Sequence, residues 1–522
     1  MPLLSFVVFL PAAGAIALLL VGNARGRRDS LFRWAALSVS LVEFAVTLLL
    51  WARFDPSRGD FQFVEQRSWI GAFGIEYHLG VDGISLFLLV LTAFLTPLAL
   101  LSSWGSVRRQ VKAFSALMLL LESAMLGVFV SLDLFLFYVF WDAMLVPMYL
   151  LIGIWGYDRR IYAAVKFILF TMVGSVLMLV AIIGLAHWHS AATGAYSFDL
   201  LKLYELKLPL HYESWFFLAF TLAFAIKVPL FPLHTWLPDA HVEAPTAGSV
   251  ILAGVLLKMG TYGLVRFSFP LFPNAATFFA PYLAVLAVVG IVYGALVAMV
   301  QPDLKKLVAY SSVSHLGFVV LGITALNMQG LQGSVYQMLS HGVSTGALFM
   351  IVGMLSDRRH TRLISEFGGL KKVMPAFTAV FLLITLSSIG LPGLNGFVGE
   401  FLILLGAFAW DARFASVAAL GVILSAVYML WMFQRVNHGP VTNEKNLALP
   451  DLDLRERCMI IPTVVMAVVM GVAPGVFLRP MAPSVERLLE RVSYSAVAAN
   501  QDRASTSRHA SAVRSRQPCS LP

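Results

Sequence analysis

Charged residues and cysteines are scarce in this sequence, and their scarcity excludes several classes of protein. Only 12% of its 522 residues are charged, against about 25% in soluble domains. The two cysteines, Cys458 and Cys519, have neither the spacing of metal ligands nor that of a redox pair. The sequence also lacks a glycine-rich phosphate-binding loop, a nucleotide-binding pattern and a pair of haem ligands. We therefore expect no cofactor, metal or redox centre in this chain.

Long hydrophobic runs dominate the sequence instead. Hydrophobic residues make up 59% of the chain, and they recur in runs of about twenty, the length of a helix that crosses a bilayer. This pattern predicts an all-α polytopic membrane protein, with no cleavable signal segment at its N-terminus. Fourteen spans are predicted, at residues 3–22, 31–51, 80–102, 112–130, 133–153, 163–187, 213–233, 247–267, 276–299, 306–326, 330–355, 374–407, 413–434 and 458–478.

The positions of Lys and Arg predict how the spans are oriented. One set of alternate loops holds 21 of these residues and the opposite set holds 7. The richer loops of a membrane protein face the cytoplasm, so the net charge of +9 indicates a bilayer and not a nucleic acid as the partner. Both termini are then expected on the outer side, which requires an even number of spans. Residues 480–522 are polar, and we expect them to form a disordered tail.

Eight ionisable side chains are predicted to lie within the spans. A lysine costs roughly 3 kcal/mol at the bilayer centre, so such groups normally face a protein interior or a wet cavity. The eight are Glu43, Glu122, Asp142, Lys227, Lys258, His315, His341 and Glu400. Acids, amines and imidazoles at similar depth on separate helices are what a proton relay requires, with Glu122 a weaker candidate and Glu43 weaker still. Each one alone could instead hydrogen-bond a neighbouring helix.

Two of the predicted spans are interrupted. The seventh breaks at Lys227–Pro232, which contains two prolines, and the twelfth breaks at Gly390–Gly396. The breaks lie five spans apart, and paired interruptions at matching positions indicate a transport site near the midplane. Two unrelated proline kinks are the alternative.

The spacing of the breaks also predicts how the chain is divided. Spans 4–8, at residues 112–267, and spans 9–13, at residues 276–434, would form two five-helix repeats. Because each repeat has an odd number of spans, the second would face the opposite way. Residues 1–111 would supply the first three helices, and residues 458–478 would supply the last one.

Several stretches are similar to one family of membrane proteins. They are Val81–Leu86, Phe137–Met148, Lys227–Pro245, Leu257–Gly263, Asp303–Gly317 and Gly390–Phe401. These stretches resemble the antiporter-like, proton-translocating membrane subunits of respiratory complex I, the NADH–quinone oxidoreductase, and most closely its bacterial subunit M branch. The resemblance covers most of the chain before about residue 480. It implies a place in the bacterial inner membrane, with the outer side periplasmic.

The resemblance also implies roles for six of the buried groups. It implies a carboxylate–lysine pair of Asp142 and Lys227, a second lysine at Lys258, connecting histidines at His315 and His341, and an acidic group at Glu400. NADH, FMN, iron–sulfur clusters and quinone would belong to partner subunits, among them sister antiporter-like subunits in the same membrane. The chain would then move protons for an oxidoreductase, as a translocase subunit, without redox chemistry of its own.

One residue departs from the family pattern. The carboxylate of the fifth span is usually glutamate, and here it is Asp142, which is one methylene shorter. We expect its ion pair with Lys227 to be longer or bridged by water. Three alternatives stay open on the sequence: a sodium or other cation/proton antiporter subunit, a membrane hydrogenase-linked subunit of the same fold, and a structural scaffold whose buried charges pair with one another.

Overall fold

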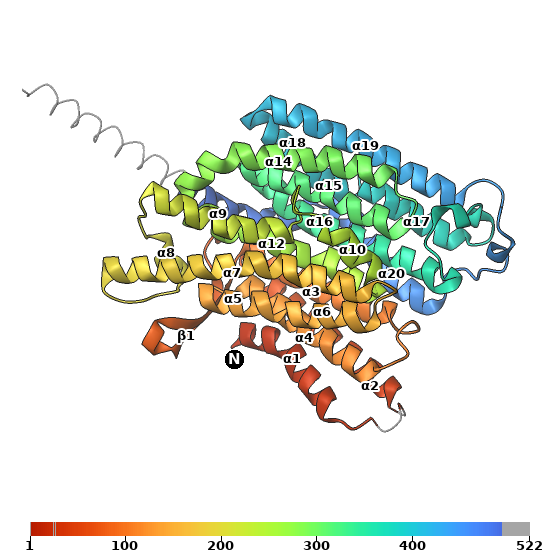
Figure 1. Ribbon diagram of the computed structural model, residues 1–522, viewed down its shortest axis with the longest axis horizontal. Helices are drawn as coiled ribbons and strands as arrows, with labels where there is room; N and C mark the ends of the chain where they lie inside the picture. The colour runs from red at the N-terminus through yellow and green to blue at the C-terminus, as the bar shows by residue number, and fades with distance from the viewer. Residues whose placement is uncertain (1, 24–25, 27, 493–522) are drawn as a thin grey trace, which may run out of the picture.

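Helices that run side by side make up nearly all of the molecule. The computed structural model describes residues 2–23, 26 and 28–492 (Figure 1). Up to the first break the helices are α1 (Leu3–Leu20), α2 (Asp29–Arg53), α3 (Gly83–Ser102), α4 (Val111–Val130), α5 (Leu134–Ala143), α6 (Leu145–Trp155), α7 (Arg160–Thr193), α8 (Leu200–Tyr204) and α9 (Leu210–Lys227).

The second part of the chain contains the longest buried helices. It comprises α10 (Trp236–Glu243), α11 (Thr246–Ile251), the π-helical turn η3 (Leu252–Leu256), α12 (Leu257–Gly263), the π-helical turn η4 (Leu264–Ser268), α13 (Phe269–Leu271), α14 (Pro273–Met299), α15 (Leu304–Thr324), α16 (Met328–Arg359), α17 (Pro375–Ser388), α18 (Asn395–Trp410), α19 (Ala412–Asn437) and α20 (Leu454–Val472).

Many of these helices have the length and composition of membrane spans. Eleven in the described part of the chain qualify, and a twelfth is added if α20 and the helix Gly475–Val492 count as one bent span. The predicted spans 213–233 and 374–407 are not among them, because each is divided by its break. Helix α9 ends at Lys227, and α17 and α18 are each too short to cross alone. The polytopic membrane fold is therefore confirmed, and the count of fourteen stays a prediction.

Both predicted helix breaks are present. Between α9 and α10 the chain forms turns, and the indole of Trp236 donates to the carbonyl of Ile226 at 2.8 Å. This bond satisfies a backbone oxygen that the end of the helix leaves free. Between α17 and α18 the turn depends on Gly390 and Gly393, whose φ angles of 77° and 90° are costly for other residues.

The prediction of an all-α fold is wrong in one region. Strands β1 (Gln62–Ile70) and β2 (Ile75–Val81) form an antiparallel hairpin between α2 and α3. The predicted span 80–102 therefore begins too early, since α3 starts at Gly83. Apolar residues before Gly83 were assigned to the helix because they continue its hydrophobic run, although they belong to β2.

The polar tail also begins later than predicted. A helix at Gly475–Val492, bent by 66° from α20, includes residues 480–492, which were expected to be disordered. It packs on the start of α3, where the hydroxyl of Ser484 accepts a hydrogen bond from the amide of Gly83 at 2.9 Å. The rest of the predicted tail, residues 493–522, lies outside the described residues.

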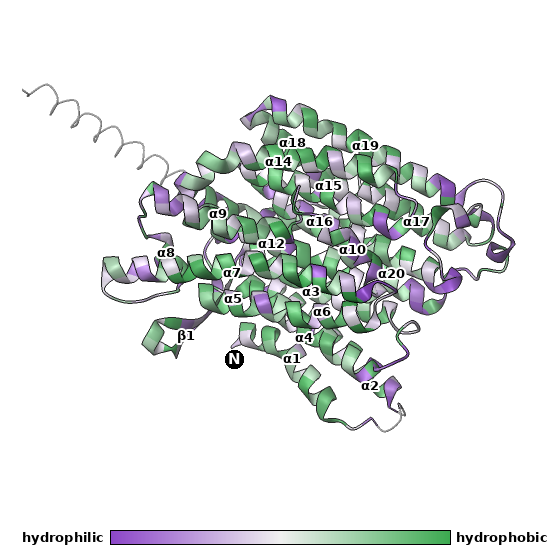
Figure 2. Ribbon diagram, in the orientation of Figure 1, coloured by the Kyte–Doolittle hydropathy of each residue, from purple (hydrophilic) through white to green (hydrophobic). Residues whose placement is uncertain are grey.

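Burial separates the helices into an outer and an inner group. Outer helices such as α7 expose apolar side chains, including Leu169, Val173 and Val180. Figure 2 shows this apolar covering, with hydrophilic residues gathered in the loops and at the helix ends. By contrast, the span Thr246–Leu271 and helix α16 are buried along their hydrophobic lengths. Lys258 and His341 lie on these two inner elements.

Candidate functional site

Four of the predicted relay residues form a row across the inner helices. The Nζ atom of Lys258 donates to Nδ1 of His341 at 2.7 Å. The ring of His341 lies 5.8 Å from that of His315, between centroids, and Nδ1 of His315 lies 2.7 Å from Oε1 of Glu400. All four side chains are at least 95% buried. The sequence identified these residues without their order, and the structure places His341 between Lys258 and His315.

Neighbouring polar groups hold the row in place. The amide of Gln337, one turn before His341 on α16, donates to Oε1 of Glu400 at 3.0 Å. Asn395, at the start of α18, accepts from the hydroxyl of Ser387 and donates to the carbonyl of Ser340 at 3.0 Å. The second helix break is therefore attached to α16 beside His341.

The π-helical turn η3 positions the lysine at the start of the row. Lys258 lies two residues after this turn, and its Nζ atom donates to the carbonyl of Ala253 within the turn. π-Helical turns of this kind occur often at functional sites. Both contacts of Lys258, with Ala253 and His341, hold its charge toward the interior of the bundle.

The predicted pair of Asp142 and Lys227 is not in direct contact. Within the described residues, no ion pair joins the two, and the carboxylate of Asp142 instead accepts from the hydroxyl of Ser175 on α7. The ammonium of Lys227 has no hydrogen-bond partner there and lies 3.6 Å from the ring centroid of Trp141. A cation in this position is stabilised by the face of the ring, which is adjacent in sequence to Asp142. Asp142 and Lys227 thus each contact a different neighbour, Ser175 and Trp141.

Helix α12 packs directly against the end of α9. A Cβ atom on Gly260 would lie 2.8 Å from the carbonyl of Phe224 and 2.9 Å from the amide of Val228. Gly260 is two residues after Lys258, and Val228 is one residue after Lys227. The close backbone approach therefore brings the helix segments that carry the two lysines together.

The remaining two predicted acids lie apart from this row. Glu43 on α2 and Glu122 on α4 are both completely buried. Among the described residues, none of their four carboxylate oxygens has a hydrogen-bond partner. Glu122 thus lies inside α4 without a hydrogen bond to any of the four residues of the row.

Among the buried basic side chains that the sequence analysis missed are His241 and Lys305. His241 on α10 is fully buried, and its ring stacks on Phe349 with centroids 4.4 Å apart. Lys305, at the start of α15, is 1% exposed and donates to the carbonyl of Ala244 at 2.6 Å. Both residues lie in the stretches that resemble complex I subunits, but neither is within a predicted hydrophobic span.

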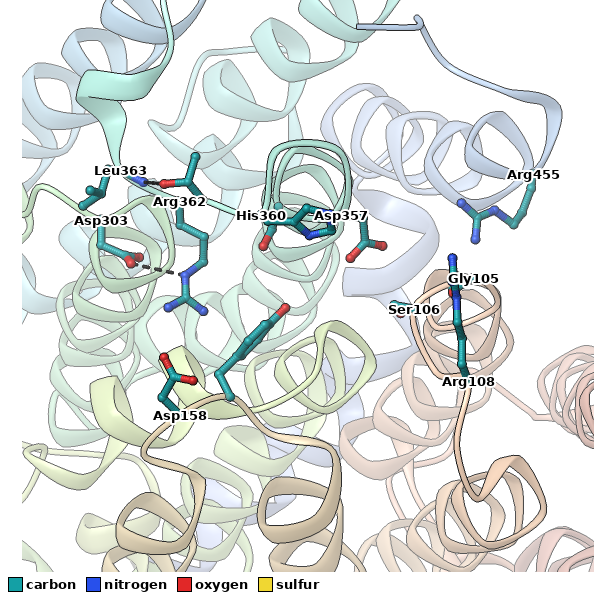
Figure 3. Close-up of a pocket in the computed structure, with 13 residues that line it drawn as sticks. Gly105, Ser106, Arg108, Asp158, Asp303, Asp357, His360, Arg362, Leu363 and Arg455 are labelled. Atoms are coloured by element: carbon teal, nitrogen blue, oxygen red, sulfur yellow. Dashed lines mark hydrogen bonds and ion pairs between the residues drawn. The ribbon is translucent and has the colours of Figure 1, made fainter. Parts of the chain in front are cut away.

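A polar cavity of about 970 Å³ opens beside Lys305 on the arginine-rich side of the molecule (Figure 3). Tyr157 lines the cavity, and Nζ of Lys305 lies 5.3 Å from the centroid of its ring. Figure 3 shows Arg362 and Asp303 joined by a dashed line at the cavity wall, and their ion pair is 3.2 Å long. Water can therefore approach within one aromatic ring of a buried lysine.

The family of the chain follows from comparison with known proteins. Residues 131–426 match the family described as NADH:quinone oxidoreductase/Mrp antiporter, TM, and residues 60–132 match the amino terminus of NADH-ubiquinone oxidoreductase chain 4. The chain belongs to this family of membrane proteins.

Two relatives within the family are named for NADH oxidoreductases. The chain is 48% identical to NADH-quinone oxidoreductase subunit M of Rhodobacter capsulatus, over 94% of this chain and 96% of the relative. It is 45% identical to NADH-ubiquinone oxidoreductase chain 4 of Arabidopsis thaliana, over 93% and 97% of the two chains. The subunit M resemblance predicted from the motifs is confirmed.

Solved structures agree with this assignment. A chain of respiratory complex I from Thermus thermophilus with bound NADH has a TM-score of 0.85 and 34% identity, covering 94% of this chain and all of that one. A chain of the Mrp complex from Dietzia has a TM-score of 0.81 at 19% identity, covering 95% and 100% of the two chains. The second likeness shows a shared fold only.

Proposed function

We propose that this chain is the proton-translocating membrane subunit M of a bacterial NADH–quinone oxidoreductase. The observation that carries the proposal is the buried row of Lys258, His341, His315 and Glu400, in which an amine, two imidazoles and an acid follow one another across the membrane interior. Its relatives are named for a complex that oxidises NADH and reduces a quinone. NADH, FMN, iron–sulfur clusters and quinone are assigned to partner subunits.

Proton transfer along the row follows from the chemistry of its members. Lys258 can pass a proton to Nδ1 of His341, because that nitrogen accepts its hydrogen bond. Among the described residues, Nε2 of neither imidazole has a hydrogen-bond partner, so a bridging water carries the proton between the two rings. Nδ1 of His315 then delivers a proton to Glu400, from which it leaves toward the outer side.

Lys227 and Asp142 supply the control step. Lys227 keeps its proton while the charge of Asp142 and the face of Trp141 stabilise the ammonium. When a neighbouring subunit draws the negative charge of Asp142 away, the buried ammonium becomes costly and gives its proton to Lys258 through water. In this proposal Asp142 alternates between two partners, the hydroxyl of Ser175 and the ammonium of Lys227.

In this proposal the chain crosses the membrane fourteen times. The two broken helices complete the count, with α9–α10 as the seventh span and α17–α18 as the twelfth. Each break then lies fourth in a five-helix repeat, and the repeats are inverted. Both termini lie on the periplasmic side, and the other membrane subunits, including sister antiporter-like subunits, adjoin the chain within the bilayer.

The test of this function is Lys227→Ala in the assembled complex, with proton translocation and quinone reduction measured together. We expect translocation by this subunit to be lost and quinone reduction to slow, since the two are coupled. Lys202→Ala is the matched control, because Lys202 is an exposed lysine of α8 that pairs with Glu76 of β2. Normal translocation in an intact Lys227→Ala complex would remove the central claim.

A cation/proton antiporter subunit is the second candidate, favoured by the shared fold with the Mrp complex. It predicts that the chain co-purifies with small membrane subunits and that transport depends on Na⁺. Subunit M predicts co-purification with NADH- and quinone-reactive subunits, whereas a hydrogenase-linked subunit predicts co-purification with a hydrogenase. The identity of the co-purifying subunits therefore separates all three.

A further inference from the structure

Glu43 and Glu122 are buried acids for which the proposed relay has no use. Each side chain has 0% exposure, and each lies near the middle of its helix, α2 or α4. Among the described residues, neither carboxyl group has a hydrogen-bond or ion-pair partner. An ionised carboxylate without a partner is very costly in such surroundings, so these groups must bind a counter-ion or a proton.

The two acids lie on helix faces that meet each other. Helices α1, α2 and α4 pack together at the lower edge of Figure 1. A Cβ atom on Gly14 of α1 would lie 2.9 Å from the side chain of Val39 and 3.4 Å from that of Leu119. Val39 is one turn before Glu43, and Leu119 is one turn before Glu122. Because α2 and α4 are separated by one spanning helix and run in the same direction, both acids reach the same depth.

The charges around the two acids offer no cation to pair with them. Helices α1 and α3 carry no charged residue between their ends. The other charged group on α4, Lys112, donates to the carbonyl of Leu19 at 2.7 Å, and Lys258 on α12 is bound to His341. On α5, Asp142 is bound to Ser175. On α2, Arg33 and Arg53 lie toward the helix ends, and Arg33 donates to the carbonyl of Val107 at 2.9 Å. Among the described residues, neither acid therefore has a cation as its partner.

The hydroxyl groups nearby suit protonated acids. Thr96 of α3 donates to the carbonyl of Thr92 at 2.9 Å, and Ser40 of α2 donates to that of Leu37 at 3.0 Å. Each hydroxyl already donates its hydrogen to a backbone carbonyl, but its oxygen keeps free lone pairs. Each can therefore accept a hydrogen bond from a carboxylic acid. A sodium ion between two carboxylates would instead leave a net negative charge in a layer without a cation.

We propose that Glu43 and Glu122 form a second proton-binding site, separate from the relay row, in which both side chains are neutral carboxylic acids in the resting protein. The site lies among the N-terminal helices, and its ligand is the proton. This proposal does not depend on the relay, because it needs no contact with Lys227 or Lys258.

Infrared spectroscopy of the purified complex tests the proposal, since a protonated carboxyl has a carbonyl band that a carboxylate lacks. Glu122→Gln and Glu43→Gln are each expected to lose one such band and to shift the other, and the double variant is expected to lose both. Glu213→Gln is the matched control. Glu213 is also buried, but Oε1 accepts from the amides of Asn274 and Ala275 at 2.7 and 3.0 Å. These donors stabilise a carboxylate, so we expect this variant to leave the acid bands unchanged.

Two results would overturn the proposal. If both variants leave the acid bands unchanged, the carboxyl groups are ionised. If the bands appear only after NaCl is replaced by choline chloride, the site binds Na⁺. Should the glutamine variants fail to assemble, Thr96→Val keeps both acids and removes one acceptor. It is expected to shift the Glu122 band without loss, and an unshifted spectrum contradicts the arrangement.

Discussion

At the scale of single residues, the sequence located the ionisable groups but not their partners. Hydrophobic spans give the depth of Lys258, His341 and Glu400, because depth follows from position along a helix. Which way each side chain points depends on how the helices are rotated against one another. The contact of Asp142 with Ser175 shows this limit, since Ser175 is one of many hydroxyls on buried helices.

Restoring the missing methylene tests how Asp142 acts. In Asp142→Glu the longer side chain can approach Lys227 more closely, and we expect proton translocation to stay within about twofold of wild type. Asp142→Asn removes the charge, which is worth about 1.5–3 kcal/mol in a hydrogen-bonded contact, so translocation should fall at least about tenfold. Ser175→Ala serves as the control for the hydroxyl alone. A large loss in Asp142→Glu would show that the surroundings are adapted to the shorter acid.

A carboxylate outside the membrane gives a prediction on pH. Burial tends to raise the pKa of Asp199, but the hydrogen bonds from His78 and from the amide of Lys202 outweigh it and hold the pKa below the ordinary 3.8. Because the folded value is lowered, Asp199 contributes stability above pH 3.8 that is lost as the pH falls through the folded value.

The hairpin that carries His78 reports this loss. Amide hydrogen exchange across residues 62–81, corrected for the intrinsic exchange rate, should rise as the pH falls below the pKa that Asp199 has in the unfolded chain. Asp199→Asn should raise it already at pH 7, whereas Asp60→Asn, a change of an exposed acid in the same region, should not. Unchanged exchange in Asp199→Asn would show that the hairpin is held by other contacts.

At the scale of elements, the positions of glycine and proline predicted the helix breaks. The periodicity of hydrophobic residues, by contrast, did not predict the hairpin. Pro229 and Pro232 cannot continue a helix, and Gly390 and Gly393 supply positive φ angles, so these positions were visible in the sequence. Strand β2 runs into α3 with a single residue, Asp82, between them. Its apolar residues therefore look like the first turn of the span.

The attachment of the second break to α16 can be tested with two asparagines. Asn395 and Asn327 both join α16 to α18, but Asn327 lies at the far end of α16, where its amide donates to the carbonyl of Gly406 at 2.8 Å. Replacing either with Ala should lower the stability of the subunit by about 1–3 kcal/mol, measured by thermal unfolding.

Only Asn395→Ala should also slow proton translocation, because it removes the hydrogen bond that attaches the second helix break to α16 beside His341. Equal translocation in the two variants would show that the break does not position the row.

At the scale of the whole molecule, the orientation in the membrane is predicted from the distribution of charge and is open to direct test. In a variant without Cys458 and Cys519, single cysteines at Lys371 and at Arg67 should react differently with a membrane-impermeant maleimide. In intact cells from which the outer membrane has been removed, only the cysteine at position 67 should be labelled, since its loop belongs to the arginine-poor set. Labelling at position 371 alone would invert the topology.

The membrane class, the family and the row of buried groups all followed from hydropathy and from motifs in the sequence. The helical region at 480–492 did not, because its polar residues give no span signal. Ser484 lies in this region and holds α3 through a contact between residues 401 positions apart. A contact so distant along the chain has no local pattern.

The π-helical turns η3 and η4 have a consequence for how the span Thr246–Leu271 can change during evolution. A π turn holds one residue more than the α-helix around it, so a single deletion inside η3 would leave the segments on either side facing as before. The same deletion between the two turns would rotate Lys258 against Arg266 by about 100°, the angle of one residue in a helix. Length variation among homologues should therefore concentrate in these turns. A deletion in η3 would, however, disturb the hydrogen bond that the carbonyl of Ala253 accepts from Lys258.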